Sequence, residues 1–124
     1  MASVVQTFAI SGGGLGPVSF TSTGNQGIDI GTVAAANANT QYPISIDVTA
    51  LKSIFLYTDG DLLVTTNAQN GAGGQNFNLT SGVPFFWNDT SGIDNPLTPD
   101  ITDFWWHNAG NAAVNVYGIV NLDL

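Results

Sequence analysis

The sequence predicts an all-β protein, a β-sandwich or jelly roll of about eight to ten short, mainly antiparallel strands. Glu and Arg are absent and Lys and Met occur once each, whereas Val, Ile, Thr and aromatic residues are frequent. Short alternating stretches recur between turn residues, including 15 Gly and 5 Pro. The chain shows no composition break or repeat. We therefore predict a single domain, 1–124, with residues 1–17 as a more flexible N-terminal arm.

Each predicted strand is a short apolar or alternating stretch bounded by turn residues. These strands are residues 4–10, 18–21, 28–30, 44–49, 54–58, 62–66, 77–79, 83–87, 102–108 and 112–124. In the first half, the Gly12–Gly16 run ends the first strand, and a turn at 24–27 separates the next two. Residues 33–41, which are rich in Ala and Asn, predict a loop or one weak helical turn.

Two turns in the second half predict hairpins. Residues 54–58 are apolar on both faces, which indicates a central strand, and Asp59-Gly60 predicts a hairpin to the next strand. Residues 88–98 predict a long loop. The last two strands are expected to pair around Asn108–Asn111. In the final strand every second residue from Val114 to Leu124 is apolar. Ile119 is the one aliphatic residue among those between them.

The charge pattern excludes several partners. All nine acidic residues are Asp, and Lys52 is the only basic residue, so the formal net charge is −8. One Lys cannot neutralise a phosphate backbone, which excludes nucleic acid and disfavours an anionic membrane surface. No apolar run reaches the length of a membrane span. The N-terminus lacks the features of a signal peptide, so we expect synthesis in the cytoplasm.

Motifs for catalysis or cofactor binding are weak. His107 is the only His, and no Gly-x-Ser-x-Gly nucleophile motif accompanies it. Asp59 and Asp61 have calcium-loop spacing, but the later Glu ligand of such a loop is missing, which leaves them as weak metal candidates in a turn. The absence of Cys excludes a thiolate metal site. We therefore expect no enzyme activity, no catalytic residues and no cofactor, with an Asp-based hydrolase as the weakest alternative.

The aromatic clusters are the candidate contact residues. Trp105 and Trp106 are neighbours on a predicted strand, so they must point to opposite faces. Phe104 and Trp106 are expected to pack inside. Trp105 and His107 are expected to face outward, into a subunit or capsid contact, because Asp103 shares their parity. The predicted interface residues are Trp105, His107, Tyr117, Ile119 and Phe86.

From about Leu51 onward the chain resembles the head decoration, or cement, proteins of tailed bacteriophages. The segments that carry the resemblance are 51–67, 77–87, 103–110 and 113–124. They include Leu-Thr-Ser-Gly-Val-Pro-Phe-Phe-Trp, an Asn-Ala-Gly turn and a final strand that contains Asn-Leu-Asp-Leu. Similar proteins are β-sandwiches or jelly rolls on the capsid surface. They are usually trimers without catalytic activity.

The resemblance implies a virion protein that binds itself and the major capsid protein. A low charge fits this role, because it limits repulsion between packed copies. A carbohydrate-binding β-sandwich is the alternative, with Trp residues as sugar platforms and Asp or Asn residues as hydroxyl or calcium ligands. We therefore expect a non-enzymatic homotrimeric decoration protein on the phage head, with carbohydrate binding as the competing hypothesis.

Overall fold

The computed structural model describes residues 4–12, 15–69 and 74–124, and these residues form ten strands and no helix. The predicted all-β class is therefore confirmed. The strands are β1 (Val4–Gly12), β2 (Leu15–Gly24), β3 (Gln26–Ala34), β4 (Ala38–Ile46), β5 (Leu51–Thr58), β6 (Leu62–Thr66), β7 (Asn76–Leu79), β8 (Phe85–Asn88), β9 (Ile101–Asn108) and β10 (Val114–Leu122).

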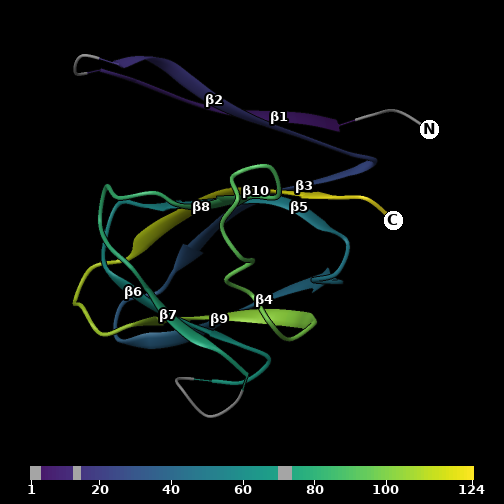
Figure 1. Cartoon of the computed structure of the whole chain (residues 1–124). Coiled ribbons are helices and arrows are strands. Elements are labelled where there is room, and N and C mark those ends of the chain that lie inside the picture. Colours follow the sequence, from purple (N-terminus) through teal and green to yellow (C-terminus); the bar gives the residue numbers. More distant parts are fainter. Residues whose placement is uncertain (1–3, 13–14, 70–73) are drawn as a thin grey trace.

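Strands β3 to β10 form two packed four-stranded antiparallel sheets. Sheet I has the order β3-β10-β5-β8, and sheet II has the order β4-β9-β6-β7 (Figure 1). The first of these eight strands pairs with the last, the second with the seventh, the third with the sixth and the fourth with the fifth. This nested pairing is the topology of a jelly roll. Of the two architectures that the sequence left open, the fold is the jelly roll.

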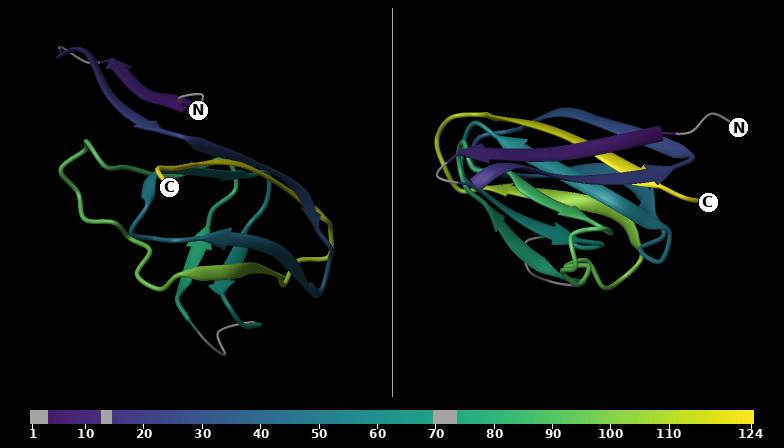
Figure 2. Two further views of the ribbon diagram at one scale, coloured as in Figure 1. Left: turned by 90° about the vertical axis from the view of Figure 1, so that its right-hand side faces the viewer. Right: turned by 45° about the horizontal axis from the view of Figure 1, so that its top comes forward.

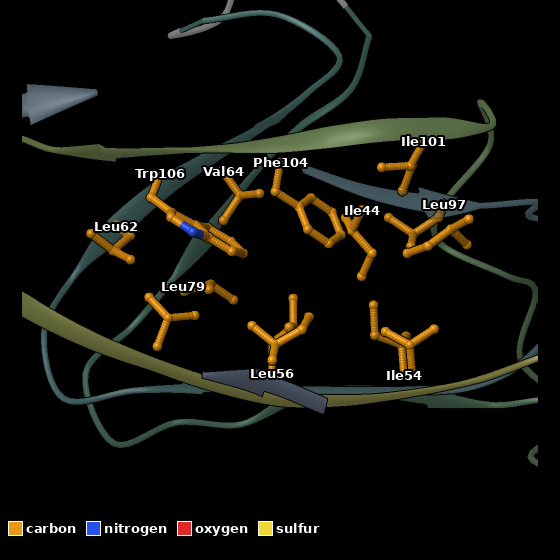
Figure 3. Packing of buried hydrophobic residues seen from close by; sticks show 14 of the residues in the cluster. Ile44, Ile54, Leu56, Leu62, Val64, Leu79, Leu97, Ile101, Phe104 and Trp106 are labelled. Carbon is orange, nitrogen blue, oxygen red and sulfur yellow. The ribbon is translucent and has the colours of Figure 1, made fainter. Parts of the chain in front are cut away.

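The core lies between the two sheets and is built from the inward residues of each strand. Phe104 and Trp106 of β9 are 0% exposed, and their rings stack at a centroid distance of 5.2 Å. Figure 3 shows them opposite Ile54 and Leu56 of sheet I. Val114, Val116 and Val120 of β10 are also buried, as the alternation predicts. The prediction of which side chains of β9 and β10 point into the core is confirmed.

Strands β1 and β2 form an antiparallel hairpin that lies as a third layer over the outer face of sheet I (Figures 1 and 2). The Phe8 ring packs 6.2 Å from that of Phe55 and 5.2 Å from that of Phe86, measured between centroids. At the base of the hairpin, the Asn25 side chain bonds both the N–H and the C=O of Leu124. The predicted arm thus contains most of this hairpin, although its residues 1–3 and 13–14 lie outside the described residues.

The two hairpins predicted in the second half of the chain are wrong. Strands β5 and β6 flank Asp59-Gly60 but lie in different sheets, as do β9 and β10. The Asp59 carboxylate accepts hydrogen bonds from the backbone and side-chain N–H groups of Asn115, which tie the turn to β10. A turn sequence specifies where the chain reverses, whereas packing of the core decides which strand becomes the neighbour.

The prediction of a loop or helical turn at 33–41 is also wrong. Most of this segment lies in β3 and β4, with a turn at 35–37 in which Asn37 has a φ of 53°. Ala34 is fully buried and pairs with Val114 of β10. The long-range ladder outweighs the weak helical preference of the Ala residues. The short strands predicted at 18–21 and 28–30 are parts of the longer strands β2 and β3.

Gly118 is expected to be intolerant of a side chain because β5 approaches β10 closely at this point. A Cβ there would lie 2.6 Å from the carbonyl oxygen of Phe55 and 2.7 Å from Cδ2 of Leu56. We expect Gly118→Ala to destabilise the protein by about 1–3 kcal/mol in urea titrations. Gly31→Ala on the adjacent strand is the control, because a Cβ there meets nothing within 4 Å. Equal stabilities for the two variants would contradict the close approach of β5 to Gly118.

Candidate functional site

The outer face of sheet I carries a cluster of exposed apolar side chains, here called the aromatic face. Its members are Val33, Tyr57, Phe86, Tyr117 and Ile119. The strand register brings them together. Tyr117 pairs with Tyr57, and Ile119 lies beside Phe55, which pairs with Phe86. Tyr117 is 52% exposed, Phe86 45% and Ile119 40%. Exposed apolar residues gathered on one face of a sheet are typical of an interaction site.

The β1–β2 hairpin covers only one side of this outer face. Phe8 packs on Phe55 and Phe86, and Gln6 hydrogen-bonds the hydroxyl of Ser53. Ser53 and Asn121, which pair across β5 and β10, are fully buried. The hairpin therefore shields the polar part of sheet I and also packs through Phe8 on Phe86 of the aromatic face, which remains 45% exposed.

The outer face of sheet II has a different character and is here called the polar face. Two cross-strand rows form it, and Trp105 lies in one of them. The first row runs Gln41, Trp105, Thr65, Asn76, and the second runs Asn39, His107, Leu63, Asn78. Six of these eight side chains carry an amide, a hydroxyl or an imidazole. Trp105 is half-buried, so one part of its indole contacts the sheet and another part is accessible.

Two hydrogen-bonded pairs flank Trp105 along β9. On one side Nε2 of Gln41 donates to Oδ2 of Asp103 at 3.0 Å. On the other side Nδ1 of His107 lies 2.8 Å from Oδ1 of Asn39. Asp103 is only 7% exposed and also accepts a hydrogen bond from the Thr102 hydroxyl. These pairs hold the side chains around the indole in defined positions.

The five predicted interface residues therefore divide between two opposite sides of the molecule. Phe86, Tyr117 and Ile119 lie on the aromatic face, whereas Trp105 and His107 lie on the polar face. A single flat contact cannot include all five. Sequence reasoning missed Tyr57 and Val33, although the apolar character of both parities at 54–58 was a usable signal for Tyr57. The predicted outward orientation of Trp105 and His107 is confirmed by their place on β9.

The three Trp residues have different environments. Trp106 is fully buried in the core, and Trp87 is 9% exposed with its Nε1–H donating to the carbonyl of Ile93 at 2.8 Å. Trp105 alone among them is accessible on a sheet face. Any sugar platform built on Trp in this protein would therefore use Trp105.

The weak metal candidates Asp59 and Asp61 form hydrogen bonds to the protein. Oδ1 of Asp59 accepts from the Asn115 backbone N–H and Oδ2 from its amide, each at 2.8 Å. Oδ1 of Asp61 accepts from the backbone N–H of Ser81, also at 2.8 Å. Within the described ranges, no three acidic or imidazole side chains come together as a metal site would require.

Two hollows adjoin these surfaces. A hollow of about 890 Å³ lies at one end of the sandwich, and its lining includes Asp61, Leu63, Asn78 and His107. It therefore borders the second row of the polar face. A smaller apolar pocket of about 320 Å³ lies between the hairpin and β8, where Phe8, Phe86 and Trp87 contribute to its lining.

Asp59 is expected to contribute to acid sensitivity. The side-chain and backbone hydrogen bonds from Asn115 hold the pKa of Asp59 below its ordinary value. A lowered folded-state pKa stabilises the fold above the unfolded-state value, and this stabilisation is lost as the pH falls through the folded-state pKa. Asp59→Asn should therefore reduce the urea midpoint at pH 7 by more than at a pH below about 3.

The control for this measurement is Asp29→Asn, which removes the same charge from the exposed edge strand β3. We expect its midpoint to follow that of the wild type at both pH values. An Asp59→Asn difference that is the same at both pH values would contradict the role assigned to the carboxylate.

Comparisons with protein-family models, curated proteins and solved structures found no match to this chain. In the described part of the chain there is also no helix with the length and apolar character needed to cross a membrane. The arguments for function therefore rest on the two faces and on the residues that form them.

Proposed function

We propose that this chain is a non-enzymatic structural protein of a bacteriophage virion, a decoration or cement protein that binds the head as a homo-oligomer. The observation that carries the proposal is the aromatic face, an exposed apolar surface on a folded jelly roll. Surfaces of this kind are buried in protein contacts. The subunits of this oligomer meet through Tyr57, Tyr117 and Ile119.

Three further features support this role. Jelly rolls are frequent in capsid proteins, although a fold by itself does not define a function. The charged fraction of the chain is only 8%, so few charges would have to be desolvated when copies pack together. The two outer faces point in opposite directions, so a subunit that contacts its neighbours through sheet I still presents sheet II to another partner (Figure 1).

The preferred assembly is a trimer, as in the family that the sequence resembles. Light scattering during gel filtration at micromolar concentration and neutral pH should give about three times the monomer mass of 12.9 kDa. The genes that flank this one should include that of a major capsid protein, and sedimentation with empty shells of that protein should show saturable binding. A monomer, or a protein that stays in the supernatant, would count against the proposal.

A further inference from the structure

The polar face of sheet II combines an accessible indole with closely spaced neutral hydrogen-bonding groups. Along β9, Trp105 lies between the Gln41–Asp103 pair and the Asn39–His107 pair. Across the sheet its row continues through Thr65, which is fully buried, to Asn76, which is exposed. From this arrangement we propose that the polar face is a binding site for a neutral oligosaccharide, with Trp105 as the stacking platform. The site does not depend on the oligomeric role proposed above.

The chemistry of these groups matches that of a sugar. One face of a pyranose ring presents C–H groups, which pack on the face of an indole, while its hydroxyl groups project from the ring edge. Because Gln41 donates through Nε2 to Asp103, its Oε1 can accept from a sugar hydroxyl. Because Asn39 faces His107 through Oδ1, its NH₂ group can donate. The platform is thus flanked by an acceptor on one side and a donor on the other.

The charge of the polar face selects a neutral ligand. Among the residues of the two rows and of the two hydrogen-bonded pairs, only Asp103 carries a carboxylate. This carboxylate already accepts hydrogen bonds from Gln41 and Thr102. Lys52, the only basic residue of the chain, lies on β5 beside Asp89. A sulfated or sialylated glycan would find no Lys or Arg side chain here, and the net charge of −8 would repel it.

The hollow at the end of the sandwich extends the site beyond one sugar unit. His107, Leu63 and Asn78 belong both to the second row of the polar face and to the lining of this hollow. A chain that stacks on Trp105 can therefore continue over His107 towards Asp61. A linear oligosaccharide fits this path better than a monosaccharide does, and affinity should rise with chain length.

The site can be tested with a printed glycan array followed by titration with maltohexaose, cellohexaose and chitohexaose. We expect at least one neutral glycan to bind and to shift the tryptophan fluorescence. Trp105→Ala should weaken this binding at least about tenfold. Trp105→Tyr retains an aromatic platform and should lose much less. Ile93→Ala, which truncates an exposed side chain in the β8–β9 loop, is the matched control and should bind like the wild type.

Several outcomes would overturn this assignment. One is a folded wild-type protein that binds no neutral glycan at millimolar concentration, and another is binding restricted to sulfated or sialylated glycans. Unchanged affinity in Trp105→Ala would exclude the platform. If the wild-type protein binds no glycan and Trp105→Ala disrupts self-association or shell binding, the polar face is a protein contact. A monomeric protein that still binds a neutral glycan through Trp105 would refute only the oligomeric role.

Discussion

Trp106→Ala is expected to unfold the protein or to lower its melting temperature by more than truncation of either other Trp. Trp106 is 0% exposed, stacks on Phe104 and packs 6.1 Å from the ring of Tyr42. Truncation of a buried Trp costs about 3–5 kcal/mol, because it removes apolar contacts and leaves a cavity. This is a large part of the roughly 5–15 kcal/mol that stabilises a domain. Circular dichroism during heating and urea titration would measure the loss.

Trp105→Ala is the matched comparison for Trp106→Ala, because it removes the same side chain from the next residue of β9. Trp105 points to the outer face of sheet II, so its truncation should leave a folded domain. Trp106→Phe keeps most of the buried ring and should fold even if Trp106→Ala does not. Similar melting temperatures for both Ala variants would show that the orientation of β9 is wrong.

The second large effect is expected on association. The double substitution Tyr117→Asp and Ile119→Asp places two charges on the aromatic face, where both residues are exposed in the monomer. An interface residue that is buried at the centre of a contact contributes about 2 kcal/mol or more. A charge left unpaired in the same contact adds a desolvation cost. We therefore expect dissociation to monomers by light scattering, with an unchanged circular dichroism spectrum and a melting temperature lowered by the loss of association.

The control for association is Asn76→Asp together with Asn78→Asp, which adds the same charge to the opposite outer face. These variants should keep the mass of the wild-type oligomer. If the aromatic-face variant keeps its oligomeric state, or if both double variants dissociate equally, the subunit contact does not lie on the aromatic face.

Local sequence patterns were sufficient to predict the strand class and the orientation of side chains in the best-patterned strands. At 103–107 and 114–122 the alternation identified Phe104, Trp106 and the valines of β10 as core residues, and each of them is buried. This works because successive side chains of a strand point to opposite faces, so the local pattern records which face meets the core. The same parity placed Trp105 and His107 on an outer face.

The choice of neighbouring strands and the grouping of the outer surfaces depend on the packing of the whole chain. Asp59-Gly60 and the 108–111 turn reverse the chain but join opposite sheets, and the 33–41 segment forms strands because β10 and β9 pair with it. Jelly-roll pairing joins strands that are far apart in sequence, so no local pattern contains it. For the same reason, the separation of Tyr117 from Trp105 onto opposite sides of the molecule follows from the packing of two sheets and not from either strand alone.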